Sequence, residues 1–264
     1  MPPAADSPAI PPGDIIVNTR AGRRGLFATM PPGRLLDIPA GGGLQTATLL
    51  ALGYRVVSVD LFSHRARREG QSWIAADANA PLPCRDASFD YVLSREGIEH
   101  LTNQMGFAGE CARVLRPGGK IVLTTPNLMH LSARASIFLT GQRNLRRGLV
   151  NEIQTPRGGK GPRKYHGHAF LLDYFRARYL MRLSGFERLE VYTDRVSPTS
   201  IAMAPLAAPL WAAMKFSLVV SKRNARRRGY PIAPREVTDE IVRHVLSPAL
   251  LFGKRMIIVA ERSA

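Results

Sequence analysis

The stretch LLDIPAGGG, residues 35–43, decides the fold. It is an apolar run that ends at Asp37, followed by Pro39 and by three consecutive glycines at 41–43. In an open parallel sheet, ligands bind beyond the carboxyl ends of the strands, and the first turn must let a ligand reach the backbone. Glycines lack the Cβ atoms that would block this approach. The stretch therefore predicts a buried strand and a ligand-binding turn, with Asp37 placed to reach a ligand ammonium group or a bridging water.

Strand and helix patterns alternate outward from this turn, which predicts an α/β protein with a parallel, doubly wound sheet. Helices are expected between most of these strands, and an amphipathic helix ending at a glycine precedes the last two. The expected strands are 33–39, 54–61, 72–78, 89–95, 120–126, 186–194 and 254–262, and the expected helices are 44–53, 63–71, 103–119 and 171–185.

Acids lie at the ends of the next two expected strands, in the same way as Asp37 lies at the end of the first. Asp60 ends the second strand, where a carboxylate can accept hydrogen bonds from both hydroxyls of a ribose. Asp77 ends the third strand and is placed to meet an adenine amino group. Three acids in this order at strand ends are more specific than a glycine-rich turn alone, and they predict a nucleoside-containing ligand.

Four motifs together resemble those of the class I S-adenosylmethionine-dependent methyltransferases, in the group with a compact methyltransferase domain. LLDIPAGGG is similar to their first motif, VVSVDLF to their ribose-binding acid motif, and AADANAPLPCRDASFDYVLSREGIEHL to their adenine segment and fourth motif. ECARVLRPGGKIVLTTPN is similar to their helix–PGG–strand signature, the most specific of the four. The resemblance covers residues 33–128 firmly, and 166–195 with the last strand more loosely.

The resemblance implies a Rossmann-like, doubly wound seven-stranded sheet in which strands 1–5 are parallel and the last strand is antiparallel. It implies S-adenosylmethionine as cofactor, with its methionine end held near Asp37. Pro39 departs from the family, which usually has glycine there. The residues expected to bind the cofactor are Asp37, Pro39, Ala40, Gly41, Gly43, Asp60, Leu61, Asp77, Ala78 and Ser94.

An E-x-x-E-H pattern follows the fourth strand, with Glu96, Glu99 and His100 at a spacing that would share one helical face. Two carboxylates suit Mg²⁺, and a transition metal would accept the imidazole. The pattern resembles the ubiquinone-pathway O-methyltransferases and the small-RNA methyltransferases, and the latter also use a downstream histidine, here His166 or His168. The expected metal ligands are Glu96, Glu99, His100 and His168.

A metal-free reading of the same residues stays open. His100 is then the general base, because an imidazole is suited to take a hydroxyl proton near neutral pH, and Glu99 assists it. In this reading Glu96 caps a turn or pairs with Arg95, and His100 can instead hydrogen-bond the adjacent loop.

The chain divides into an N-terminal arm, 1–32, and a methyltransferase domain, 33–264, with substrate-cap insertions at 128–165 and 196–253. The second insertion holds an apolar segment, 201–220, followed by the basic run KRNARRR. We expect a shallow amphipathic or re-entrant element that contacts an anionic membrane surface. The alternatives are a helical cap whose apolar face packs on the domain, and a dimer interface.

Composition limits the classes of partner. The 264 residues are 45% hydrophobic, enough for a full core, and the formal net charge of +17 favours an anionic partner unless an arginine-rich composition alone explains it. Cys84 and Cys111 have no metal or redox spacing, and no secretory signal is evident, so a cytoplasmic protein with reduced thiols is expected.

The function expected from these features is O-methylation of a lipid-linked, polyprenyl or glycan-type small molecule, in the cytoplasm and peripheral to the inner face of the membrane. One alternative is a ribose methyltransferase acting on RNA with a metal-assisted site. The basic run 143–164 lacks interleaved aromatic residues, which weighs against RNA. The other alternative is a cofactor-binding scaffold without activity, for which Pro39 is the best evidence.

Overall fold

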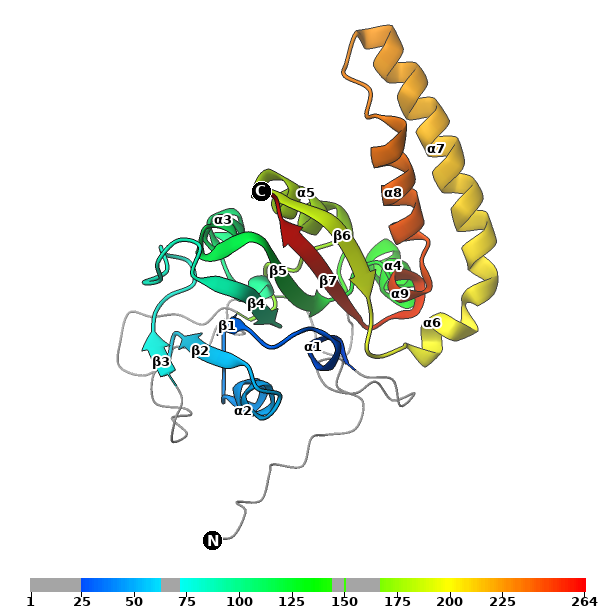
Figure 1. Cartoon of the computed structure of the whole chain (residues 1–264). Helices are drawn as coiled ribbons and strands as arrows, with labels where there is room; N and C mark the ends of the chain where they lie inside the picture. Colours follow the sequence, from blue (N-terminus) through cyan, green and yellow to red (C-terminus); the bar gives the residue numbers. More distant parts are fainter. Residues whose placement is uncertain (1–24, 63–71, 144–149, 151–166) are drawn as a thin grey trace, which may run out of the picture.

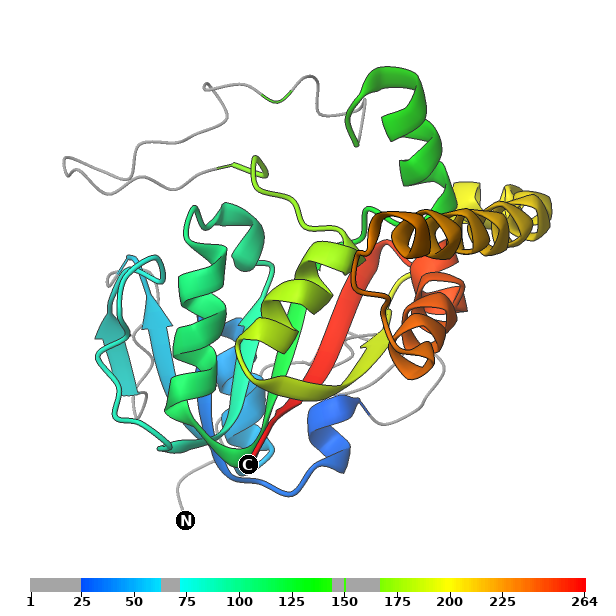
Figure 2. The same cartoon turned by 90° about the horizontal axis from the view of Figure 1, so that it is seen from above.

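A computed structural model describes residues 25–62, 72–143, 150 and 167–264. These residues form a seven-stranded sheet with helices on both faces (Figure 1, Figure 2). The elements in chain order are α1 Leu26–Thr29, β1 Arg34–Asp37, α2 Leu44–Ala51, β2 Arg55–Asp60, β3 Ser72–Ala75, β4 Phe89–Arg95, η1 Ile98–His100, α3 Gln104–Val114, β5 Leu115–Pro126, α4 Leu131–Thr140, α5 Tyr174–Leu183, β6 Phe186–Tyr192, α6 Pro198–Ala202, η4 Ala204–Leu206, α7 Ala207–Arg228, α8 Arg235–Val245, α9 Pro248–Phe252 and β7 Arg255–Arg262. The helix expected at 63–71 lies outside the described residues.

The sheet has the strand order β3-β2-β1-β4-β5-β7-β6. The pairs among β1 to β5 are parallel, and Leu36 of β1 is level with Val57 of β2 and Val92 of β4. β7 lies antiparallel between β5 and β6. The predicted Rossmann-like sheet with an antiparallel last strand is therefore confirmed.

Both faces of the central strands are buried, which is why those strands read as continuous apolar runs. Leu36 and Val92 face a core cluster with residues of α3 and α5, such as Phe107 and Met181. Their neighbours along the strands point to the other face and join a second cluster with α1 and α2. Because β1 to β5 are parallel, their carboxyl ends lie at one edge of the sheet, where the expected ligand-binding residues follow.

Part of the expected arm belongs to the domain. Phe27 of α1 is buried, and its ring packs edge-on against Tyr54 and Tyr91 at centroid distances of 5.5 and 6.1 Å. The Tyr54 hydroxyl donates to the Phe27 carbonyl oxygen at 2.9 Å. The expected boundary at residue 32 therefore falls after a helix that packs into the domain, because a four-residue helix leaves too short an apolar pattern to recognise.

Two expected element ends are also corrected. β3 ends at Ala75, so Asp77 lies beyond the strand rather than at its end. α3 ends at Val114, and the Pro-Gly-Gly sequence lies within β5 rather than in the helix. Pro117 lacks the N–H that a further helical turn needs, and Gly118 has a positive φ of 75°.

The two insertions are largely helical where they are described. The first contains α4, and the second consists of α6, η4, α7, α8 and α9. α7 and α8 project from the domain as a helical hairpin (Figure 1). α7 is one continuous helix in which no residue is buried. It therefore does not form the alternative expected from the sequence, a cap whose apolar face packs on the domain. Pro205 lies in η4 and Pro209 in the first turn of α7, where a missing N–H costs little.

Candidate functional site

The carboxylate of Asp60 ties the end of β2 to the glycine turn after β1. Its Oδ2 accepts a hydrogen bond from the N–H of Gly41 at 2.9 Å, and its Oδ1 accepts one from the N–H of Phe62 at 2.9 Å. Each carboxylate oxygen has a second lone pair, so Asp60 can still accept from two hydroxyls. Leu61, which follows it, is half-buried at the same edge.

The glycine turn has the open, left-handed backbone that its sequence predicts. Gly41 and Gly43 have φ values of 54° and 70°, which side-chain-bearing residues rarely adopt. A Cβ atom placed on Gly41 or Gly42 would meet no atom of the described residues within 4 Å, so the turn surface is bare. Ala40 is buried, and its N–H donates to the Val59 carbonyl oxygen at 2.9 Å, which fixes the turn to β2.

Asp37 is fully buried and only half satisfied. Its Oδ2 accepts from the hydroxyl of Thr46 at 2.6 Å, and that hydroxyl also lies 2.9 Å from Ser58 Oγ. Its Oδ1 has no hydrogen-bond partner among the described residues. Burial raises the pKa of Asp37 to about 7, against the hydrogen bond from Thr46 and the charge of Arg95, which lower it. A cationic ligand group beside Oδ1 would favour the ionised form.

Pro39 packs against Gly97, the residue that follows Glu96 after β4. A Cβ atom on Gly97 would lie within 2.6 Å of Pro39 Cγ, and closer still to Cδ. The same Cβ position is 3.5 Å from Ser94 Oγ, which is buried and has no hydrogen-bond partner within the described part of the chain. Because Gly97 has no side chain, there is room for the Pro39 ring beside it. The ring stiffens the turn but does not cover its glycines.

The adenine-binding candidates lie at the rim of the site. Asp77 is exposed, and its Oδ1 accepts from the backbone N–H and the side-chain amide of Asn79 at 2.9 and 3.0 Å. Ala78 is buried. Asn79 Oδ1 in turn accepts from the N–H groups of Thr102 and Asn103 at 2.8 and 3.0 Å. Asn79, which sequence reasoning did not single out, joins this segment to the loop before α3.

Glu96 does not share a helical face with Glu99 and His100, so that expectation is wrong. Glu96 has a positive φ of 49°, and the short 3₁₀ helix η1 begins only at Ile98. Its Oε1 lies 3.1 Å from Arg255 Nε and accepts from the Thr124 hydroxyl at 3.2 Å. Arg255 also pairs with Asp194, whose side chain is buried. Glu96 is thus held by Arg255 of β7. Its carboxylate pairs with this residue and not with Arg95, the pairing that the metal-free reading offered.

Glu99, His100 and His168 come together. Each offers one ligand atom, and these atoms all lie within 4.8 Å of one another. Glu99 Oε2 accepts from the Thr125 hydroxyl at 3.0 Å, while Oε1 is buried without a hydrogen-bond partner in the described ranges. Burial and the charge of Glu96 raise the pKa of Glu99 to about 7.

The loop that carries His168 is fastened to η1 and α3. Gln104 Nε2 donates to the carbonyl oxygens of Ile98 and Phe170, at 2.9 and 2.7 Å. His100 Nδ1 lies 3.3 Å from the Gly167 carbonyl oxygen. When Nδ1 carries the proton and donates to that oxygen, Nε2 is the nitrogen that carries the lone pair, which is the form that binds a metal or takes up a proton. The expected hydrogen bond of His100 to the loop and an active role are therefore compatible; His166 lies outside the described residues.

Several residues of the site were missed from the sequence. Thr46 and Thr125 orient the carboxylates of Asp37 and Glu99, and Arg255 orients Glu96. Thr46 had a usable signal, since it lies in the first turn of the helix after the glycines. Arg255 had none, because its partner is 159 positions away in the sequence and meets it only in the folded sheet.

The cofactor candidates fit a ligand that carries both cationic and hydroxyl groups. The unpartnered Oδ1 of Asp37 and Oγ of Ser94 are buried at the ends of β1 and β4, and the bare turn lies between β1 and Asp60. Such a set can meet the amino group and ribose of S-adenosylmethionine. The metal candidates fit less well with Mg²⁺, because two imidazoles and one carboxylate suit transition metals, whereas Mg²⁺ prefers oxygen ligands.

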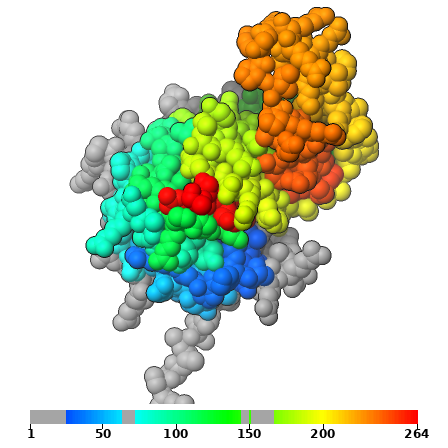
Figure 3. Space-filling view, turned by 45° about the horizontal axis from the view of Figure 1, so that its top comes forward, coloured from blue at the N-terminus to red at the C-terminus, as the bar shows by residue number. Residues whose placement is uncertain are grey.

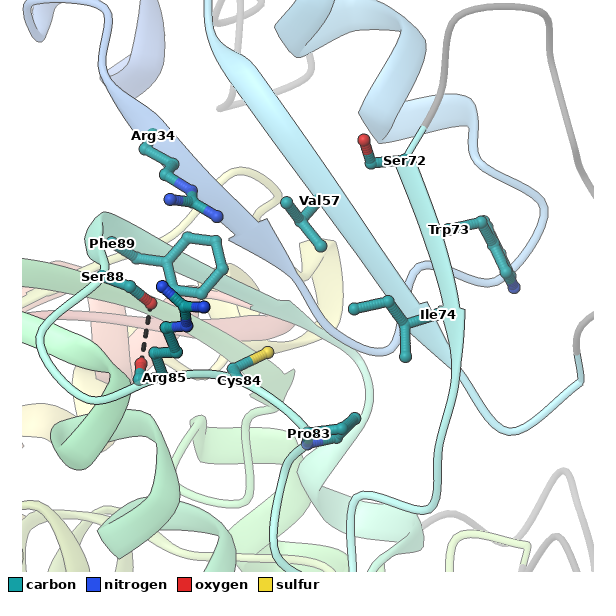
Figure 4. Close-up of a pocket in the computed structure, with 10 residues that line it drawn as sticks. All are labelled: Arg34, Val57, Ser72, Trp73, Ile74, Pro83, Cys84, Arg85, Ser88 and Phe89. Atoms are coloured by element: carbon teal, nitrogen blue, oxygen red, sulfur yellow. Dashed lines mark hydrogen bonds between the residues drawn. The ribbon is translucent and has the colours of Figure 1, made fainter.

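A separate pocket of about 530 Å³ lies at the opposite end of the sheet (Figure 4). Arg34, Ser72 and Phe89, the first residues of β1, β3 and β4, line it. The Arg34 guanidinium lies 5.1 Å from the centre of the Phe89 ring. The pocket is therefore remote from the carboxyl ends of the strands and is no part of the candidate site.

Comparisons with known proteins agree with this geometry. Residues 36–123 match the family described as "Methyltransferase domain". The chain is 36% identical over 103 residues to a ubiquinone biosynthesis O-methyltransferase of Parvibaculum lavamentivorans, covering 36% of this chain and 40% of that protein. It is 35% identical over 122 residues to the enzyme of the same name from Agrobacterium fabrum, covering 43% and 48%. The matched part thus spans less than half the length of these relatives.

Solved structures support the fold. A SAM-dependent methyltransferase from Thermotoga maritima superposes with a TM-score of 0.50 at 14% identity, over 90% of this chain and 86% of the other. One from Archaeoglobus fulgidus gives a TM-score of 0.50 at 14% identity, over 88% and 86%. At these identities the likeness concerns the fold alone.

The contact of Pro39 with Gly97 predicts a coupled pair. Gly97→Ala should lower the free energy of unfolding by about 1–3 kcal/mol, because the added methyl group overlaps the proline ring. Pro39→Gly in the same chain should recover most of that loss. Urea unfolding of the two single variants and the double variant measures the coupling.

Gly42→Ala is the matched control, since its Cβ position is open and its φ is not positive. It should change the unfolding free energy by less than about 0.5 kcal/mol. Additive effects of Pro39→Gly and Gly97→Ala would contradict the contact.

Proposed function

We propose that the chain is a class I S-adenosylmethionine-dependent methyltransferase, supported by the family match over residues 36–123, and that it methylates a hydroxyl oxygen of a lipid-linked, polyprenyl or glycan-type small molecule. The observation that carries the proposal is the group of Glu99, His100 and His168 at the end of β4, beside the turn that fits the cofactor. This group would supply a base at the place where the acceptor hydroxyl would meet the methyl group of the cofactor.

The residues at the strand ends would hold the cofactor. Asp37 would take its amino group through the unpartnered Oδ1, while Gly41 and Gly43 leave the backbone open to the methionine end. Asp60 would accept from the ribose hydroxyls, and Asp77 would meet the adenine amino group. The cofactor supplies an electrophilic methyl carbon on a sulfonium, which departs as a neutral thioether.

The work of the protein is alignment and proton removal. Methyl transfer is an in-line displacement, so holding donor and acceptor in one geometry supplies much of the rate. As the acceptor oxygen forms its bond to carbon, the carbon–sulfur bond breaks and its electron pair stays on sulfur. His100 Nε2 would take the hydroxyl proton, with Nδ1–H donating to the Gly167 oxygen and Glu99 stabilising the imidazolium.

Oxygen as the acceptor atom is supported by the names of the relatives. Both proteins reported above are ubiquinone biosynthesis O-methyltransferases, although they match only 36% and 43% of this chain. A lipid-linked acceptor would be met in the cytoplasm, at the inner face of the membrane. The long insertion between β6 and β7 is the part of the chain that could define it.

An RNA ribose methyltransferase is the second candidate function. The pair of imidazoles at the site and the net charge of +17 favour it. A scaffold that binds the cofactor without activity is the third; the open glycines beside Pro39 weigh against it, because the proline leaves the turn accessible.

A methyl-transfer assay tests the proposal. Protein is incubated with cofactor carrying a tritiated methyl group and, in parallel, a membrane lipid extract and a total RNA preparation. Label should enter the lipid fraction as an alkali-stable methyl ether. His100→Ala should lower the rate by about 100-fold or more, because the acceptor loses its base.

Glu236→Gln, an exposed carboxylate at the start of α8, is the control and should leave the rate unchanged. Label in RNA alone would replace the proposed function by the second candidate. Cofactor binding without label in either fraction would favour the scaffold.

As the alternative to this metal-free role of His100, we propose that Glu99, His100 and His168 bind one divalent cation in place of the proton on Nε2, and Mn²⁺ or Zn²⁺ suits these donors better than the Mg²⁺ expected from sequence. Such an ion would lower the pKa of a hydroxyl bound to it and orient that hydroxyl. Glu96 is outside this set because Arg255 neutralises it.

Metal content distinguishes the two roles of His100. The purified protein should contain about one equivalent of a transition metal by mass spectrometry, and His168→Ala should lose it with the fold intact by circular dichroism. Mn²⁺ titrated into chelator-treated protein should bind, and should not bind His168→Ala. If neither form binds Mn²⁺ or Zn²⁺, the cation is excluded and His100 acts as a metal-free base.

A further inference from the structure

α7 buries none of its residues among the described parts of the chain, whereas its partner in the hairpin is anchored. α8 is fixed to α5, because Glu240 accepts from Arg178 and Arg182 at 3.1 and 2.8 Å and His244 Nδ1 lies 2.7 Å from the Tyr174 hydroxyl. α7 has 22 residues and none is buried. In the space-filling view the hairpin extends beyond the body of the domain (Figure 3).

One side of α7 turns toward α8, and the opposite side faces outward. The half-buried positions recur every three or four residues, as one face of a helix must. They are Ala207, Leu210, Met214, Leu218, Lys222 and Ala225. The opposite side is fully open to solvent and begins with an apolar stretch, in which Phe216 and Val219 are 71% and 66% exposed.

Polarity changes along the axis of α7 rather than around it. Its first fourteen residues, 207–220, have Lys215 as their only charged side chain, and the last seven contain five basic residues. No acidic residue occurs in the helix. Lys215 Nζ lies 5.9 Å from the centre of the Trp211 ring, and Trp211 is 52% exposed. The amphipathic distribution expected from the sequence is thus replaced by an apolar half and a cationic half on one outward face.

We propose that this outward face of α7 docks on the surface of an anionic lipid bilayer, with the helix lying along it. Phe216 and Val219 would enter the interfacial region, and Arg223, Arg226 and Arg227 would meet the head groups. Aromatic and basic side chains are the ones that such an interface accommodates, and the partner must be anionic because the helix carries only positive charge.

Two other arrangements fit less well. The segment Ala204–Arg228 is long and apolar enough to cross a membrane by length and composition alone. Its crossing would carry α8 with it, and α8 has charged residues at 235, 236, 239, 240 and 243. A second copy of the chain would place the arginine cluster of each copy against an apolar or equally positive surface, which opposes association.

The inference deepens the proposed function, since a lipid-linked acceptor would be reached at this surface. The docking itself requires no methyl transfer. The two ideas can therefore fail separately, provided that vesicle binding, cofactor binding and methyl transfer are all measured on the same preparations.

Sedimentation of the full-length protein with vesicles tests the docking. It should sediment with vesicles of mixed phosphatidylglycerol and phosphatidylcholine, and not with vesicles of phosphatidylcholine alone. Arg223→Gln with Arg226→Gln should weaken binding by about 25-fold, since each basic side chain near an anionic surface contributes roughly fivefold. Phe216→Ser with Val219→Ser should weaken it by at least about tenfold, because both side chains lose apolar burial.

Matched controls use exposed residues on the domain itself. Arg55→Gln with Arg85→Gln removes two charges far from the hairpin, and Tyr179→Ser with Leu183→Ser removes two apolar side chains from α5. Both should bind vesicles as the wild type does, and all variants should bind S-adenosylhomocysteine equally. Equal losses in the control and α7 variants would overturn the proposal and assign the binding to net charge or overall hydrophobicity.

Two further outcomes would also overturn it. One is the absence of vesicle binding together with a dimer, in light scattering, that Phe216→Ser with Val219→Ser converts to a monomer. The other is the absence of vesicle binding together with RNA binding that the arginine variant abolishes. Loss of docking with methyl transfer to a soluble short-chain acceptor retained would leave the proposed function standing.

Discussion

The hydrogen bond from the Gly41 N–H to Asp60 Oδ2 is the contact on which the site depends. It joins the turn after β1 to the end of β2, so that one carboxylate shapes the backbone of the turn and, in the proposed function, would also accept hydrogen bonds from the cofactor. The parallel arrangement of β1 to β5 makes the contact possible, because it brings strand ends that are 23 residues apart in the sequence to one edge. Ala40, held to β2 through Val59, fixes the same turn from the other side.

At the same edge of the sheet, two threonines and one arginine orient the carboxylates of the site. Within the described part of the chain, Asp37 and Glu99 each keep one unpartnered oxygen beside the hydrogen bond from Thr46 or Thr125, and Arg255 holds Glu96 away from the group. Buried oxygens without partners are costly in a folded protein, and in the proposed function a bound ligand would complete the hydrogen bonding of these two carboxylates. Pro39 has a packing role at this edge, because its ring occupies the space that Gly97 leaves open by having no side chain.

The sequence was sufficient for the sheet, because apolar runs and their spacing report local structure directly. The strands, the glycine turn and the acids after β1 and β2 are where the pattern predicts them. It was insufficient where geometry depends on distant partners. Glu96 at its spacing could be helical, but its contacts with Arg255 of the last strand and with Thr124 of β5 hold it outside the group formed by Glu99 and the histidines. The same holds for α7, whose apolar residues give no sign in the sequence that α8 covers one side and leaves the other exposed.

The direct test of the central claim is calorimetric titration of S-adenosylhomocysteine into the wild-type protein and into Asp60→Ala. The account predicts binding to the wild type and an affinity lower by about 100-fold or more in the variant, because two charge-assisted hydrogen bonds that shape the turn and the ribose contacts are lost together. Circular dichroism should show the variant folded. No binding to the wild type, or equal binding by a folded Asp60→Ala, would contradict the account.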